Sequence, residues 1–96
     1  MRNDRFEWDD EKARRNLANH HVSFERATVV FNDPNGLDEI DDEPSEERWK
    51  TTGLDVNRVL VAVWTGRQGN RIRIISARRA TRHEEDSYYR QARFEE

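Results

Sequence analysis

The stretch R-V-L-V-A-V-W-T-G-R-Q-G-N-R-I-R-I-I-S-A-R-R-A-T-R-H-E, residues 58–84, decides the fold class of this 96-residue chain. Residues 58–65 and 71–78 are rich in β-branched side chains, and the short segment between them contains two glycines and an asparagine, which predicts an antiparallel hairpin. The T-x-x-E sequence at 81–84 is a capping-box signature, so we predict a last helix that runs toward residue 93. A hairpin followed by a helix indicates an α+β domain.

Two further strands are expected upstream of this hairpin, over residues 37–41 and 48–54. The connection at 55–57 is short enough for a second antiparallel hairpin, so the simplest sheet is a meander of three or four strands. Before the first of these strands, residues 33–36 read Asp-Pro-Asn-Gly, where proline ends a helix and Asn-Gly accepts positive φ. The helical part of the N-terminal region should therefore end there.

The N-terminal third is predicted to be mainly helical. Asp9 and Asp10 supply an N-cap and negative charge for a helix through about residue 19, with Ala13 and Leu17 four positions apart on its buried face. Ser23 offers a second N-cap. The apolar stripe of the helix that follows has the spacing i, i+3, i+4 and i+7, with Phe24, Ala27, Thr28 and Phe31.

The first residues of the chain have a different pattern. Phe6 and Trp8 alternate with Glu7, which indicates a short extended segment that buries both aromatic rings on one side. We expect four aromatic side chains, those of Phe6, Trp8, Trp49 and Trp64, to lie in the core or at its rim, although an exposed tryptophan could stack on a base.

Charge is segregated along the chain, although the net charge is only −3. Residues 33–47 hold eight acids and no Lys or Arg, whereas residues 48–82 hold nine Lys and Arg and one acid. A basic region of this density is the electrostatic footprint of a phosphate-bearing partner, and the acidic strip could pair with it or with another protein. Pro44 and Ser45 mark the part of the acidic strip that we expect to be disordered.

Length and composition predict one domain over residues 1–96. No apolar run reaches the roughly 18 residues of a membrane span, and the first residues lack the apolar core of a signal peptide. The absence of cysteine excludes disulfides and thiolate metal sites, and no histidine spacing converges three metal ligands. We therefore expect a cytoplasmic protein without contact to a membrane, and chemistry without a metal or cofactor.

Several motifs together resemble the BrnT toxins. They are F-E-W-D at 6–9, Lys12, Asn16, His20 or His21 with V-S-F-E at 22–25, V-F-N-D-P at 30–34, E-E-R-W at 46–49, Gly53 and R-I-R-I-I-S-A-R-R-A-T at 71–81. The resemblance covers nearly the whole chain. It implies a RelE-like α+β fold with two N-terminal helices, an antiparallel sheet of three to four strands and a C-terminal helix.

The same resemblance implies a function. It predicts an endoribonuclease toxin of a type II toxin–antitoxin system, which cleaves RNA and is neutralised by a BrnA-type ribbon-helix-helix antitoxin. Operator DNA would be bound only through that antitoxin. One departure from the family pattern is His20-His21 where many relatives have His-Gly, so we expect the turn after the first helix to differ slightly, because glycine enters the left-handed conformation more easily.

Cleavage of RNA without a metal requires proton removal from a ribose 2′-oxygen, protonation of the 5′-oxygen and positive charge near the phosphorane. In the strand from residue 71, successive side chains point to opposite faces of the sheet. The set expected on the open face is Arg71, Arg73, Ile75, Ala77 and Arg79. The set expected on the other face is Ile72, Ile74, Ser76 and Arg78. The strand from residue 48 places Arg48 and Lys50 on the open face, with Trp49 packed inward. We therefore predict a catalytic cluster of Arg48, Lys50, Arg71 and Arg73.

Proton transfer must involve another group, because a guanidinium cannot act as a base at ordinary pH. Lys50 is the candidate on this face, since neighbouring arginine charges would favour its neutral amine, and a route through the RNA or water is the alternative. His20, His21 and His83 are expected to have structural roles at helix ends or on the surface.

Five further residues, three basic and two aromatic, are assigned to binding. Arg78, Arg79 and Arg82 are predicted to contact RNA, while Arg79, Arg82, Tyr88 and Tyr89 are predicted to contact the antitoxin. Two other functions stay open at this point. The chain could be a non-catalytic module of the same fold that acts as an antitoxin-bound co-repressor of its operon, or a basic single-strand binder without turnover.

Overall fold

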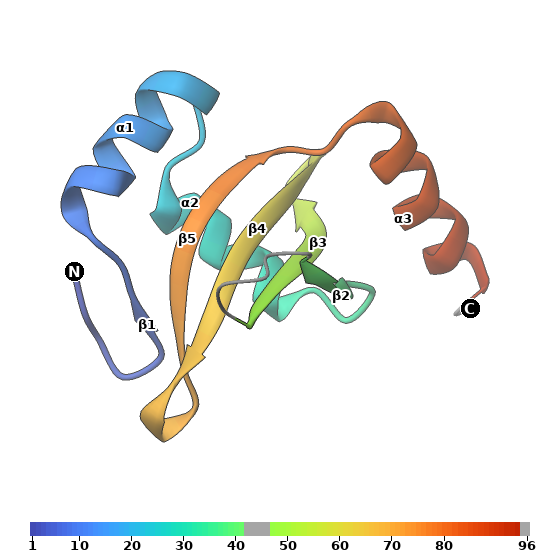
Figure 1. Cartoon of the computed structure of the whole chain (residues 1–96). Coiled ribbons are helices and arrows are strands. Elements are labelled where there is room, and N and C mark those ends of the chain that lie inside the picture. The colour runs from blue at the N-terminus through green and yellow to red at the C-terminus, as the bar shows by residue number, and fades with distance from the viewer. Residues whose placement is uncertain (42–46, 95–96) are drawn as a thin grey trace.

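The computed structural model describes residues 1–41 and 47–94, which fold as an α+β domain with three α-helices and one five-stranded sheet (Figure 1). The elements follow in the order β1 (Phe6–Glu7), α1 (Asp10–His20), α2 (Phe24–Ala27), η1 (Thr28–Asn32), β2 (Leu37–Asp41), β3 (Arg48–Asp55), β4 (Arg58–Arg67), η2 (Gln68–Asn70), β5 (Arg71–Arg79) and α3 (Arg82–Phe94). The α+β class is thus as expected from the hairpin and the capping box.

The sheet has the strand order β1-β5-β4-β3-β2. Strands β2 to β5 form the predicted antiparallel meander, while β1 adds a parallel strand beside β5, with Phe6 opposite Ile72. The expected antiparallel sheet of three to four strands is therefore a mixed sheet of five. A strand of two residues is too short to show an alternation of apolar and polar side chains, so the sequence does not reveal its pairing. The pairing depends on β5, where the Ile72 N–H donates to the Arg5 carbonyl at 2.7 Å.

The helix starts follow the predicted caps. The Asp9 carboxylate accepts from the Lys12 N–H at 2.9 Å, and the Ser23 hydroxyl accepts from the Arg26 N–H at 3.0 Å. The second helix differs from the prediction, because only residues 24–27 are α-helical and the chain continues as the 3-10 helix η1. Three β-branched residues in η1, Thr28 to Val30, disfavour an α-helix, and η1 packs tightly on β3.

Gly53 in β3 permits this close packing. A Cβ atom at Gly53 would lie 2.8 Å from the Val30 Cβ and 2.9 Å from the Val30 carbonyl oxygen. Only a residue without a side chain allows the backbones of β3 and η1 to approach so closely.

The buried face of α1 also differs from the expectation. Leu17 is 49% exposed, whereas Asn16 is buried and Ala13 packs at the edge of the core. The Asn16 amide donates to the carbonyls of Val22 and Ala77, at 2.9 and 2.7 Å, and accepts from the Ala77 N–H at 3.1 Å. This asparagine ties α1 to β5, so the face of the helix is set by a polar contact that hydrophobic spacing does not reveal.

The helices α1 and α2 with η1 cover one face of the sheet, and α2 passes behind β5 and β4 in Figure 1. The core between these layers contains Trp8, Phe24, Val30, Leu60 and Ile74. We call this side the helix-covered face and the other side the open face. The helix α3 stands apart from the other helices and contacts β3.

An irregularity in β5 changes which of its side chains share a face. Val63 pairs with Ser76 and Trp64 pairs with Ile74, so Ile75 is an extra residue of β5. One extra residue reverses the alternation beyond it. The prediction for residues beyond Ile75 is therefore wrong: the open face carries Arg71, Arg73, Ser76 and Arg78, and the helix-covered face carries Ile72, Ile74, Ala77 and Arg79.

Other local predictions are confirmed with small differences. The Asp33 carbonyl accepts from the Gly36 N–H at 3.0 Å in the expected turn, and Thr81 and Glu84 form both hydrogen bonds of the capping box. The difference expected for the turn after α1 is not seen, because His21 has a left-handed φ of 61° and so adopts the conformation in which glycine is usually found. Pro44 and Ser45 lie outside the described residues.

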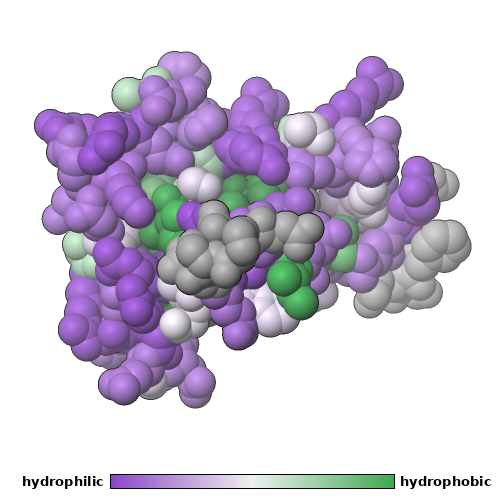
Figure 2. Space-filling model, viewed as in Figure 1, coloured by the Kyte–Doolittle hydropathy of each residue, from purple (hydrophilic) through white to green (hydrophobic). Residues whose placement is uncertain are grey.

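Figure 2 shows a largely hydrophilic surface on the side seen in Figure 1, with the strongest hydrophobic colour near its centre. Among the described helices, none is long and apolar enough to cross a membrane.

Candidate functional site

A carboxylate in contact with three arginines forms the first of two charged clusters on the open face. Glu7 accepts from Arg71 Nη2 at 2.6 Å and from Arg73 Nη1 at 2.7 Å, and its carboxylate lies 3.8 Å from Arg67 Nε. We call these four residues the arginine cluster. The parallel pairing of β1 with β5 places Glu7 opposite Arg73, so both side chains leave the sheet on the same side.

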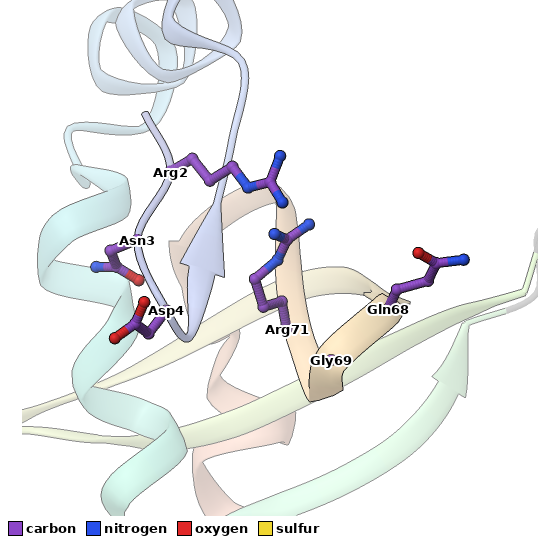
Figure 3. A pocket seen from close by; sticks show the side chains of 6 residues that line it. All are labelled: Arg2, Asn3, Asp4, Gln68, Gly69 and Arg71. Carbon is purple, nitrogen blue, oxygen red and sulfur yellow. The ribbon is translucent and has the colours of Figure 1, made fainter.

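The arginine cluster lies beside a hollow of about 510 Å³ between the N-terminal segment and the β4–β5 turn. Its lining consists of Arg2, Glu7, Gly66, Arg67, Gln68 and Arg71, and we call it the arginine hollow. A neighbouring hollow shares Arg2 and Arg71 with it, and Figure 3 shows the guanidinium groups of these two residues pointing toward one another. Guanidinium groups that converge in this way favour an anion between them.

Local hydrogen bonds fold the first residues back to hold Arg2 in this position. The Asn3 side-chain oxygen accepts from the N–H groups of Arg5 and Phe6, at 2.9 and 2.7 Å. The Trp8 N–H donates to the Met1 carbonyl at 3.0 Å, and Arg2 bridges antiparallel to Glu7. The chain reversal therefore brings a fourth arginine to Glu7.

The second charged cluster is organised by Glu84, in the first turn of α3. Arg78 donates to both Glu84 oxygens at 2.7 and 2.9 Å, and Lys50 Nζ lies 3.6 Å from Glu84 and 3.6 Å from Glu39. The hydrogen bond from Arg78 is the largest of the effects that lower the pKa of Glu84 to about 2. We call these four residues the Glu84 cluster. Glu84 is therefore an anion at neutral pH, and it joins α3 to β3 and β5.

The structure divides the predicted catalytic residues between the two clusters. Arg71 and Arg73 belong to the arginine cluster, whereas Lys50 belongs to the Glu84 cluster. Arg48 lies at the start of β3 with the same side-chain direction as Lys50. The ion pairs of Lys50 are with the carboxylates of Glu39 and Glu84, so the expected neighbourhood of arginines around Lys50 is wrong.

The residues predicted to bind RNA or antitoxin are also separated. Arg78 is on the open face, Arg79 is exposed on the other face, and Arg82 is exposed at the start of α3. Tyr89 is 43% exposed, but Tyr88 is buried and its hydroxyl donates to Asp33. Tyr88 therefore anchors α3 on the turn before β2 in this structure, while Tyr89 is open to a partner.

The hydroxyl of Tyr88 is held in its neutral form by this contact. Burial, followed by the hydrogen bond to Asp33, raises the pKa of Tyr88. Burial also opposes ionisation of Asp33, but hydrogen bonds from Tyr88 and from the N–H groups of Leu54 and Asn35 outweigh it and lower the pKa of Asp33. The anchor of α3 is thus a charge-assisted hydrogen bond.

The three histidines lie in different surroundings. His20 and His21 are exposed at the end of α1, as expected for a structural role. His83 lines a hollow of about 370 Å³ between α3 and the β2–β3 edge, together with Lys50, Thr52 and Glu84. Among the residues that the structure describes, no three His, Asp or Glu side chains converge to hold a metal ion.

Sequence comparison assigns the chain to a family. Residues 8–84 match the family described as the ribonuclease toxin BrnT of type II toxin–antitoxin systems. The chain belongs to the BrnT family. The matched range runs from Trp8 to Glu84, the last residue of the capping box of α3.

A solved structure has the same fold as this BrnT-family chain. It is the 1.1 Å crystal structure of the Brucella abortus ribonuclease toxin BrnT, which superimposes with a TM-score of 0.64 over 81% of this chain and 97% of the other. The two sequences are 18% identical, so the likeness concerns the fold. No curated protein sequence matches this chain.

The matched range of the BrnT family contains the whole Glu84 cluster and the three arginines of the arginine cluster, but it excludes two residues of the arginine hollow. Arg2 and Glu7 precede residue 8, whereas Arg67, Arg71 and Arg73 lie within the range. The sequence pattern does not single out Arg2, Glu7 or Arg67 as site residues. The alternation of Glu7 with two buried aromatic residues does indicate that it points away from the core, but only the pairing of β1 with β5 shows that it meets arginines.

Proposed function

We propose that this BrnT-family protein is an endoribonuclease that cleaves RNA by attack of a ribose 2′-oxygen on the adjacent phosphate, without a metal ion or cofactor. The convergence of Arg67, Arg71 and Arg73 beside an open hollow is the observation that carries this proposal. Three guanidinium groups supply the positive charge that a phosphorane requires, and each can bind two phosphate oxygens in parallel.

The Glu84 cluster extends this surface along the open face. Arg78 and Lys50 lie on the same face of the sheet as Arg71 and Arg73, so an RNA strand bound in the arginine hollow would have further cations for its neighbouring phosphates. We assign Arg48, Lys50, Arg78 and Arg82 to this binding role, since phosphate contacts orient RNA without reading its sequence.

The partner that fits the family is a BrnA-type ribbon-helix-helix antitoxin, through which the toxin would reach operator DNA. We place its contact on the exposed side chains of Arg79, Arg82 and Tyr89, with Tyr88 available only if α3 moves. The order of helices, sheet and terminal helix supports a RelE-type relationship, with one toxin domain acting on RNA in the cytoplasm.

The test is cleavage of a defined RNA oligonucleotide by the purified full chain in excess EDTA. We expect products with a 2′,3′-cyclic phosphate and a 5′-hydroxyl, and no cleavage of an oligonucleotide that lacks the 2′-hydroxyl at the cut site. Arg71→Ala should reduce the rate about a hundredfold. Arg14→Ala, on the exposed side of α1, is the matched control and should cleave as the parent does.

Two results would contradict the proposal. If cleavage requires an added divalent ion, the proposed metal-independent mechanism is wrong. Salt-sensitive RNA binding without products would favour the non-catalytic function instead.

A further inference from the structure

The arginine hollow contains one acidic group among the residues that line it, the carboxylate of Glu7. The side chain of Glu7 is 12% exposed, so it is enclosed by the arginines but still open to the hollow. A carboxylate in the middle of a phosphate site is unfavourable for binding, because it repels the phosphate that the arginines attract. The presence of the Glu7 carboxylate in the arginine hollow therefore needs a chemical explanation.

The arginines keep Glu7 ionised. The hydrogen bond from Arg73 is the largest of the effects that lower the pKa of Glu7, and the charges of Arg71, Arg73 and Arg67 act in the same direction against the effect of desolvation. An ionised carboxylate at neutral pH accepts protons and does not donate them. In this state Glu7 can accept a proton, although the arginines that lower its pKa also weaken it as a base.

The arginines also retain donors for a substrate. A guanidinium has five N–H donors, and Glu7 accepts from Nη2 of Arg71 and from Nη1 of Arg73. Arg71 Nε is buried and without a hydrogen-bond partner among the described residues, so the donors left for a substrate are the remaining Nη–H groups. A phosphodiester bound to the same guanidinium groups would lie beside Glu7, and its negative charge would raise the proton affinity of the carboxylate when the base is needed.

We propose that Glu7 is the general base of this ribonuclease, taking the proton from the 2′-hydroxyl of the RNA while Arg71 and Arg73 hold the phosphate. This inference rests on the proposed endoribonuclease function. Lys50 does not compete for the role, because it is paired with Glu39 and Glu84 and does not line the arginine hollow. The charged groups that face Glu7 are those of Arg2, Arg67, Arg71 and Arg73.

The step balances as an in-line displacement. The 2′-O–H bond breaks and its proton passes to a Glu7 oxygen, while the 2′-oxygen forms a bond to phosphorus. The bond from phosphorus to the 5′-oxygen breaks, and the departing 5′-oxygen takes a proton from water. Glu7 then returns its proton to solvent, which leaves a 2′,3′-cyclic phosphate and a 5′-hydroxyl product.

The principal test is single-turnover cleavage by Glu7→Gln, which keeps the size of the side chain and a hydrogen-bond acceptor but cannot take up the proton. We expect a rate at least on the order of a hundredfold below the parent, with RNA affinity equal or higher because a negative charge has left the hollow. Glu25→Gln removes the same charge from α2, on the other side of the sheet, and should cleave at the parental rate.

Two further measurements separate a base from a structural anchor of the arginines. The logarithm of the parental rate should rise with unit slope as pH increases through the ionisation of Glu7 and then level off, whereas Glu7→Gln should lose this limb. A substrate with sulfur in place of the 5′-oxygen needs no proton on its leaving group, so it should not restore the rate of Glu7→Gln. Glu7→Asp, which keeps a carboxylate, should retain the acidic limb at a reduced rate and serves if Glu7→Gln fails to fold.

The outcomes distinguish this inference from the function on which it rests. Suppose that the parent makes the cyclic phosphate without metal. If a folded Glu7→Gln protein then cleaves at the parental rate, or if the sulfur substrate restores its cleavage rate, Glu7 is not the base. The proposed function would stand in both cases. Loss of RNA affinity without loss of the bound-state rate would make Glu7 an anchor only. If the parent itself does not cleave, the proposed function fails.

Discussion

Arg78 and Arg79 show how neighbouring residues acquire different roles. They are adjacent in β5, but the extra residue Ile75 places Arg78 on the open face and Arg79 on the helix-covered face. Arg78 is consequently paired with Glu84, whereas Arg79 is exposed opposite Leu60. A charge count along the sequence treats both as equal parts of one basic surface.

We expect Arg73→Ala to lower RNA cleavage about a hundredfold without unfolding the protein, because in the proposed mechanism it removes one direct contact to the developing phosphorane. Single-turnover rates with circular dichroism of the folded variant measure this. Arg79→Ala removes the same charge from the other face, and its rate should stay within a few-fold of the parent. Full activity of a folded Arg73→Ala protein would contradict the assignment of the site.

Glu84 should make the free energy of unfolding depend on pH in the acidic range. Its pKa is lowered from the ordinary 4.5 to about 2 in the folded protein, so its ionic contribution is present above about pH 4.5 and is lost as pH falls toward 2. We expect Glu84→Gln to reduce the free energy of unfolding at pH 7 by about 2 kcal/mol, since one pKa unit corresponds to about 1.4 kcal/mol and solvent screens part of the pair. Urea unfolding measures the difference from the parent, which should shrink below pH 3. A difference that does not change with pH would show that the ion pair adds no stability.

At the scale of the elements, the short helices depend on their packing. The helix α2 has four residues and continues into η1, so its backbone hydrogen bonds alone cannot hold it in place. Phe24 is fully buried and meets Trp8 edge-on, with ring centroids 5.7 Å apart. Phe31 in η1 lies between Phe6 and Trp64 but is only partly buried.

The two phenylalanines should therefore differ in their contribution to stability. We expect Phe24→Ala to lower the free energy of unfolding by about 3 to 5 kcal/mol, a large share of the stability of a small domain, and Phe31→Ala to lower it by less. Denaturant unfolding of both variants measures this. Parental stability of Phe24→Ala would show that the buried face of α2 is wrongly assigned.

At the scale of the whole molecule, cations of the basic region are distributed over two surfaces. The open face carries the arginine cluster and the Glu84 cluster, where several cations are partly neutralised by Glu7, Glu39 and Glu84. Arg79 and Arg82 are exposed outside both clusters, and α3 with the exposed Tyr89 follows them in the chain. An acidic antitoxin segment would thus meet cations before it meets the apolar contacts of α3.

The association rate of toxin and antitoxin should therefore fall as salt rises, with affinity changing less if the buried contacts are apolar. Stopped-flow association and dissociation rates at low and high salt measure this. Charge reversal at Arg79 and Arg82 should reduce the association rate further. An association rate that does not respond to salt or to these substitutions would place the antitoxin elsewhere, for example on the acidic strip.

The sequence by itself determined the family and most of the elements, although not the short α2 with η1 or the pairing of β1. The caps of α1, α2 and α3, the hairpins of the meander and the position of Arg71 and Arg73 on the open face all depend on neighbours within a few residues, whose chemistry can be read along the chain. Only the tertiary structure decided how the site is assembled. Glu7 meets Arg71 across 64 positions because β1 pairs parallel with β5, and the bulge at Ile75 separates Arg78 from Arg79, since long-range pairing and register are set by the sheet as a whole.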